Sequence, residues 1–252
     1  MLAAFTFPPI DELFRWQDLA FGDTPFAINK TSLLMMISVA LILIIFIGGS
    51  RRMKLIPSRL QNVLEMTYEF IDRGITRDVI GADATRFTPF LGSLFLFILF
   101  LNVWEVIPFI QFPPTARFGV PLYLALQTYA IYWYVALRHQ GFKYLTGHLF
   151  LPGVPWPMYF LLAPIELLQI VVVRPFSLAV RLLANMMAGH ILLTALALLT
   201  AYALENAPII AIGPFALNVG VTAFEILVGF LQAYIFTLLT AVYIGDSLHP
   251  EH

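Results

Sequence analysis

Apolar residues gather into long runs along most of this chain. The first run covers residues 31–49, and four more cover residues 87–112, 118–137, 158–204 and 213–245. A helix of roughly 20 apolar residues is long enough to cross the hydrocarbon core of a bilayer. The pattern therefore predicts an all-α integral membrane protein with about five transmembrane helices in a single membrane domain over residues 31–252.

The fourth run is unusually long. Its only charged residues are Glu166, Arg174 and Arg181. A helix over its whole length would measure about 70 Å, twice the roughly 30 Å of a hydrocarbon core. Two crossings would need a polar turn, and the stretch from Arg174 to Ser177 is a poor one. We therefore predict one steeply tilted helix, kinked at Pro164 or Pro175, that forms a hairpin with the last long helix.

The segment between the first two runs has a different pattern. Over residues 57–79, apolar side chains recur at helical spacing, with polar side chains on the other side. The apolar set is Leu60, Val63, Leu64, Tyr68 and Ile71, and the polar set is Gln61, Glu65, Glu69 and Asp72. This pattern predicts an amphipathic helix on the cytoplasmic face, either as a solvated loop helix or as a docking surface.

Basic residues indicate the orientation of the chain. Arg51, Arg52 and Lys54 directly follow the first run. The positive-inside rule then places this segment in the cytoplasm and residues 1–30 outside the membrane. Five crossings bring the polar C-terminal tail back to the cytoplasmic side.

Composition narrows the possible functions. Hydrophobic residues make up 60 % of the chain and charged residues 12 %, the formal net charge is −1, and there is no cysteine. Nucleic-acid binding through a basic surface is excluded, as are disulfides and thiolate metal sites. No glycine-rich phosphate loop is present, so no nucleotide or other cofactor is expected. A metal site at His190 and Glu225 would have too few ligands.

Several ionisable residues interrupt the apolar runs. Those of formal charge are Glu105, Glu166, Arg174, Arg181 and Glu225, and the titratable His190 joins them. A charge at the centre of a bilayer costs roughly 2.5–3.5 kcal/mol on insertion scales, so each of these residues needs either a structural partner or a function.

Helical spacing arranges these residues on faces. At 100° per residue, one stripe of the fourth run holds Glu166, Arg174, Ser177, Arg181 and Asn185. On the last helix, Asn218, Glu225 and Gln232 recur every seven residues and share one face. In an antiparallel hairpin of these helices, His190 and Glu225 lie at equal depth near the outside. Arg181 and Gln232 meet nearer the centre, and Glu166 lies on the inner side. This order suggests two half-paths for protons, divided by a fixed positive charge.

Three stretches resemble a known family. RPFSLAVRLLANMMAGH at residues 174–190 and FEILVGFLQAYIFTLLTAVY at residues 224–243 look like the two signatures of subunit a of F-type ATP synthases. LNVWEVIP at residues 101–108 matches a third, weaker one. The resemblance covers nearly the whole chain beyond residue 30.

The resemblance implies specific roles. Arg181 matches the essential arginine of the family, Asn185 its polar partner, and Gln232 the glutamine that faces the arginine. His190 and Glu225 match the pair of the outer half-channel, Asn102 and Glu105 match its other polar residues, and Glu166 matches an acid of the inner half-channel. Arg174 stands where many relatives carry lysine. The positions of the histidine and the acid are exchanged relative to many bacterial members, and Leu183-Ala184 replaces a common Phe-Gly.

The resemblance implies a stator proton channel rather than an enzyme acting alone. Two offset half-channels would carry protons to and from the carboxylates of a rotating ring of c subunits. Further expected partners are peripheral-stalk b subunits, the soluble ATPase head and the lipid bilayer. The expected location is a bacterial plasma membrane, in preference to a mitochondrial inner membrane. A proton-coupled secondary carrier is the alternative, although no internal repeat supports it.

Overall fold

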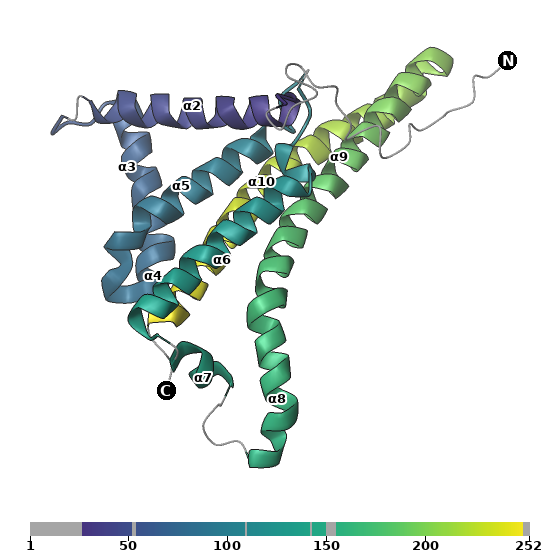
Figure 1. Cartoon of the computed structure of the whole chain (residues 1–252). Helices are drawn as coiled ribbons and strands as arrows, with labels where there is room; N and C mark the ends of the chain where they lie inside the picture. The colour runs from purple at the N-terminus through teal and green to yellow at the C-terminus, as the bar shows by residue number, and fades with distance from the viewer. Residues whose placement is uncertain (1–26, 52–53, 109, 142, 150–154, 249–252) are drawn as a thin grey trace. The chain divides into compact units, whose positions relative to one another are not determined.

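A computed structural model describes residues 27–51, 54–108, 110–141, 143–149 and 155–248. The predicted N-terminal segment and the end of the C-terminal tail lie almost entirely outside these residues. The longer helices are α2 (Lys30–Ser50), α3 (Arg59–Ile71), α5 (Ala84–Val103), α6 (Gly119–His139), α7 (Lys143–Leu149), α8 (Trp156–Leu168), α9 (Arg174–Asn206) and α10 (Pro208–Leu248) (Figure 1). The described residues form no β-strand, so the predicted all-α fold class is confirmed.

Five helical segments are long and apolar enough to cross a membrane. They are α2, α5, α6, the combined stretch Trp156–Asn206, and α10. This confirms the predicted number of spans. One difference concerns the second run: α5 ends at Val103, whereas the apolar run continues to residue 112. Pro108, Pro113 and Pro114 have no backbone N–H to continue a helix, so this segment forms turns instead.

The unusually long fourth run forms one uninterrupted helical segment, which is the prediction made from its lack of a polar turn. Its 51 residues run from α8 into α9 (Figure 1). Between the two lies a π-helical turn, η4 (Gln169–Val173), where the Arg174 N–H donates to the carbonyl of Gln169. Pro175 follows directly and cannot donate a backbone hydrogen bond, which gives a physical reason for the wider turn at this point.

The long helices α9 and α10 are joined by Ala207 alone. The Ala207 N–H donates to the carbonyl of Ala203 at 2.8 Å, which closes the last turn of α9. Pro208 then opens α10, a position where its missing N–H costs nothing. A hairpin results, as predicted.

The chain divides into two compact units. The first unit comprises Met1–Leu43, Phe97–Arg117 and Leu182–Gln232, and the second comprises Ile44–Leu96, Phe118–Arg181 and Ala233–His252. Within the first unit, Leu34, Trp104 and Phe112 form a buried cluster. The Trp104 indole N–H donates to the Ser38 hydroxyl at 2.7 Å, so its polar edge is satisfied inside the apolar core.

Within the second unit, the predicted amphipathic segment begins as α3, with the Ser58 hydroxyl accepting from the Gln61 N–H at the N-terminus. A π-helical turn, η1 (Asp72–Arg77), follows. The apolar Leu60 and Val63 are exposed, whereas Gln61, predicted on the polar face, is buried. The Gln61 side chain donates to the Lys54 carbonyl at 3.0 Å, and this contact explains its burial.

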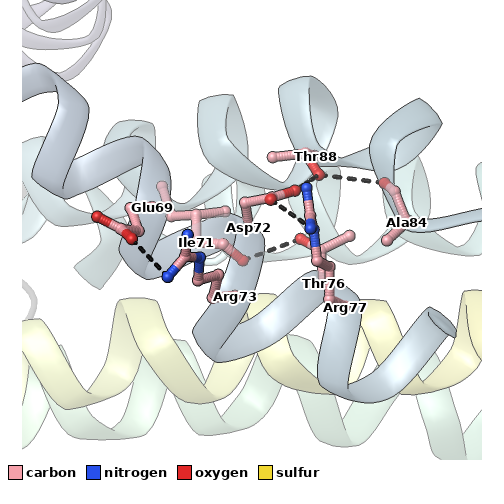
Figure 2. Close-up of polar contacts among 8 residues, drawn as sticks. All are labelled: Glu69, Ile71, Asp72, Arg73, Thr76, Arg77, Ala84 and Thr88. Carbon is pink, nitrogen blue, oxygen red and sulfur yellow. Dashed lines mark hydrogen bonds and ion pairs between the residues drawn. The ribbon is translucent and has the colours of Figure 1, made fainter. Parts of the chain in front are cut away.

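Asp72 is the best-satisfied buried acid of the second unit (Figure 2). Its side chain is 3 % exposed. The Thr88 hydroxyl donates to Oδ1 at 2.8 Å, and Arg77 Nε lies 2.7 Å from Oδ2. The Thr76 hydroxyl donates to the Ile71 carbonyl at 3.0 Å, so a side chain within the π-helical turn also stabilises it. This cluster links η1 to the start of α5.

Candidate functional site

Polar side chains are buried together in the first unit, near the end of α5. They lie around the start of the segment that follows, residues 104–108 and 110–117, which we call the turn segment. The Asn102 side chain is 3 % exposed. Its amide donates to the Gly229 carbonyl on α10 at 3.1 Å, and its carbonyl accepts from the Thr115 hydroxyl at 2.9 Å. A Cβ at position 229 would lie 3.2 Å from the Asn102 Cβ, so glycine allows this close approach. Asn102 therefore joins the turn segment to α10.

Glu225 lies directly against the backbone of α9. A Cβ added at Gly189 would lie 2.6 Å from Glu225 Oε2, which is closer than real Cβ contacts allow. The Glu225 side chain is buried, and Oε2 has no hydrogen-bond partner among the described residues. Gly189 precedes His190 in the sequence. The carboxyl group therefore lies beside the residue that precedes His190.

The His190 ring is buried and meets the ring of Phe112 edge-on, with centroids 6.1 Å apart. Phe112 belongs to the turn segment, so this segment meets α9 at the histidine. A direct contact between His190 and Glu225 stays a prediction.

A cavity of about 320 Å³ lies beside these groups within the first unit. Glu225 and Asn102 line it together with apolar side chains that include Val106 and Phe230. Glu105, predicted for the same path, is 2 % exposed, and its Oε1 has no hydrogen-bond partner among the residues described. Two buried carboxyl groups with an unsatisfied oxygen each are therefore present in this unit.

Asn185 and Gln232 form the second contact across the hairpin. The Asn185 amide donates to Gln232 Oε1 at 2.7 Å. Together with the approach of Glu225 to Gly189, this bond fixes an antiparallel register in which residue 185 faces 232 and residue 189 faces 225. Arg181 lies one helical turn before Asn185 on α9, and residues four apart share a face.

Arg174 lies at the start of α9 in the second unit. Its guanidinium lies 5.1 Å from the centroid of the Tyr243 ring and 3.7 Å from Asp246 Oδ2. The remaining predicted residues make fewer polar contacts. The side chains of Glu166, Ser177 and Asn218 form no hydrogen bond or ion pair with the part of the chain that the structure describes.

Sequence reasoning missed several contributors. Gly189, Thr115, Phe112 and Asp246 were not singled out, because their contacts depend on segments far apart in the chain. A glycine inside an apolar helix was the one available signal for a close approach. Among the described residues, no group of three or more His, Cys, Asp or Glu could hold a metal ion.

The fold and this site define a class: a polytopic α-helical membrane protein with buried titratable and amide side chains between its two longest helices, suited to moving an ion. The family model described as "ATP synthase A chain" matches residues 32–245, and the chain belongs to this family. The resemblance seen in the signature stretches is thereby confirmed. Proteins of this family are the proton-translocating, non-catalytic subunit of ATP synthase.

Full-length relatives support the same assignment. The chain is 40 % identical to ATP synthase subunit a of Frankia alni over 97 % of this chain and 87 % of the relative. It is 37 % identical to ATP synthase subunit a of Rhodococcus erythropolis over 98 % of this chain and 92 % of the relative. Identity to the same subunit of Hyphomonas neptunium is 37 %, over 95 % and 94 % of the two chains. Membership implies a place in the membrane and assembly with other ATP synthase subunits.

Proposed function

We propose that this chain provides two offset half-channels that carry protons to and from the carboxylates of a rotating ring of c subunits. One observation supports this proposal above all others. The Glu225 carboxyl group is buried against Gly189, lines a cavity of about 320 Å³ with Asn102, and has an oxygen without a described partner. A buried acid in this state is suited to accept and release a proton rather than to hold the fold together.

In the outer half-channel, protons pass Asn102, Glu105, His190 and Glu225. Ionising both Glu105 and Glu225 is unfavourable, because both are buried and their negative charges repel each other. A proton that enters is therefore shared along the path until it reaches the ring.

Arg181 divides the two half-channels. A guanidinium carries a permanent positive charge in proteins. It keeps the passing ring carboxylate ionised and repels protons, so that they do not leak from one half-channel to the other. The bond between Asn185 and Gln232 stabilises the α9–α10 hairpin one turn away. A ring carboxylate that has been neutralised by a proton can turn through lipid without the cost of a bare charge.

The inner half-channel uses Glu166, Ser177 and Arg174. A proton released by the ring leaves along this side. Asn218 belongs to the proton path nearer the outer end of α10, on the helix face that carries Glu225. One charge that crosses 100 mV supplies about 2.3 kcal/mol, so several protons must be summed for each ATP.

The test of this mechanism is Arg181→Ala in the whole complex. Coupled ATP synthesis and ATP-driven pumping are expected to fall by at least about 100-fold, because the loss of one preorganised hydrogen-bond donor already costs about this much in enzyme active sites. Passive proton leak should persist or rise. Pumping is measured by pH-dependent fluorescence quenching in inverted vesicles, with subunit content and ATPase activity alongside.

Arg174→Lys is the matched control, since it keeps a positive charge beside Asp246 and Tyr243 and should retain most of the synthesis rate. Normal coupled synthesis by the Arg181→Ala complex contradicts the mechanism.

The proposed location is a bacterial plasma membrane, with the N-terminus outside and the C-terminus in the cytoplasm. The basic residues after α2 support this orientation. Proposed contacts within the complex are the c ring, the b subunits of the peripheral stalk and, through them, the ATPase head. Tags at Ser50 and at the C-terminus should both be protected from reagents added outside the cell. Labelling of the C-terminal tag from outside would reverse the proposed topology.

A further inference from the structure

The outer end of α2 is joined to the turn segment that follows α5, and both belong to the first unit. Lys30 Nζ donates to the Ile110 carbonyl at 2.9 Å. Arg117 donates to the Thr31 hydroxyl at 3.2 Å. Two cationic side chains therefore join the same two elements, and they allow a matched comparison.

Lys30 has a second contact, with an aromatic ring. Its ammonium group lies 5.4 Å from the centroid of the Phe112 ring. The ring of Phe112 is fully buried and meets His190 edge-on at 6.1 Å, with an interplanar angle of 86°. A cation attracts the electron-rich face of an aromatic ring and leaves its positive edge for other partners. Lys30, Phe112 and His190 thus form a stack that runs from α2 to α9.

We propose that Lys30 is a positioning residue of the outer proton path: anchored on the Ile110 carbonyl, its ammonium group holds the Phe112 ring, and that ring sets the orientation of His190. The proposal rests on the function proposed above, in which His190 transfers protons. It adds α2 to the path, whereas the signature stretches on α5, α9 and α10 leave this helix out. A proton passes between groups only when donor and acceptor align, so a ring that turns away slows transfer.

The experiment measures ATP synthesis by the whole complex in proteoliposomes under an imposed proton gradient, normalised to assembled complex. Lys30→Met keeps the apolar stem and removes the ammonium group, and its rate should fall on the order of tenfold. Lys30→Arg keeps a cation over the ring and should recover at least half of the rate. Arg117→Met removes the other link between the same elements and should keep the wild-type rate.

A double variant separates positioning from simple anchoring. Because Lys30 acts through Phe112, Phe112→Leu should slow synthesis to about the same extent, and the Lys30→Met/Phe112→Leu pair should be no slower than Phe112→Leu alone. Additive losses in this pair, or equal losses in Lys30→Met and Arg117→Met, overturn the proposal. If Lys30→Met does not assemble, Phe112→Leu decides the question, since a wild-type rate there also overturns it.

His190→Ala keeps this test distinct from the test of the proposed function. If His190→Ala loses synthesis while Lys30→Met is normal, the positioning role is wrong and the proton path stands. If His190→Ala synthesises ATP at the wild-type rate, the assignment of His190 to the path is wrong, and the positioning role falls with it.

Discussion

Two buried acids, one in each unit, differ in how they are satisfied. Asp72 in the second unit is 3 % exposed, and both of its oxygens have partners, Thr88 and Arg77. Glu225 in the first unit is 7 % exposed, and its Oε2 has no hydrogen-bond partner among the described residues. A buried carboxylate without partners is costly, and the protonated form avoids that cost. The difference separates an acid whose oxygens are both paired from an acid with an unpaired oxygen, and the proton-transfer role proposed for Glu225 rests on that difference.

Two glycines repeat this contrast. Gly189 lies against the Glu225 carboxyl group, whereas a Cβ at Gly245 in the second unit would lie 3.2 Å from the backbone carbonyl of Val79. The first glycine makes room for a titratable side chain, and the second makes room for another backbone. Close packing therefore brings a carboxyl group against a helix in one unit and a backbone carbonyl against a helix in the other.

The comparison is tested most strongly by neutral amide variants of the two acids. Glu225→Gln cannot accept a proton as a carboxylate does, so ATP synthesis should fall by about 100-fold or more while the complex assembles. Asp72→Asn should keep the rate within about twofold and lower stability by about 1–2 kcal/mol, a modest loss because Arg77 is largely exposed. Synthesis assays and thermal unfolding of the purified complex measure both.

The contrast is wrong if Asp72→Asn loses more of the synthesis rate per assembled complex than Glu225→Gln does. The charge of the second unit would then act in proton transfer.

The glycine pair is expected to show an intermediate effect. Gly189→Ala places a methyl group within 2.6 Å of Glu225 Oε2, so the carboxyl group must move, and synthesis should fall roughly tenfold. Gly245→Ala should leave the rate per complex nearly unchanged. Its stability should change by less than about 1–2 kcal/mol, because the higher helix propensity of alanine offsets part of the crowding. Similar rates for the two variants would show that the position of the Glu225 carboxyl group is unimportant.

The smallest effect is expected at the Asn185–Gln232 bond. Asn185→Ala and Gln232→Ala should each slow synthesis a few-fold, and the double variant should be less than additive, with a coupling of about 1 kcal/mol. Thr128→Ala with Thr240→Ala is the matched control, because these hydroxyls lie 3.4 Å apart in the second unit. Its synthesis rate per complex should be unchanged. Strict additivity at Asn185 and Gln232 would mean that their bond does not support the path.

Counting along the sequence was accurate where local spacing decides the answer. The absence of a polar turn between Glu166 and Arg181 predicted one long helix, and the structure has it. Depth counting along the two helices predicts a pair of His190 and Glu225, and this pair stays a prediction; the structure has Glu225 against Gly189. The long helix is predictable because an uninterrupted helix rises by about 1.5 Å per residue, so position along the chain is position along the axis.

Hydrophobicity gave a wrong helix end where an apolar run continues beyond the helix. The sequence predicts one span over residues 87–112, yet α5 ends at Val103, and the described residues that follow it form turns near the prolines. The burial of Gln61 and Asp72 was also missed, since both were expected on a polar face. Each is buried because a specific partner satisfies it, and apolar content does not report such partners.

The sequence by itself determined the helical membrane fold, the number of spans and the family, because apolar run length and short signature stretches are local properties. The tertiary structure decided which buried polar atoms are satisfied. Asp72 pairs with Thr88, Asn102 with the Gly229 carbonyl, and Lys30 with Phe112, all across distant segments. A residue's type sets what it can donate or accept, but only packing brings a partner within about 3 Å. The pairing of a buried acid is therefore decided only in the folded chain.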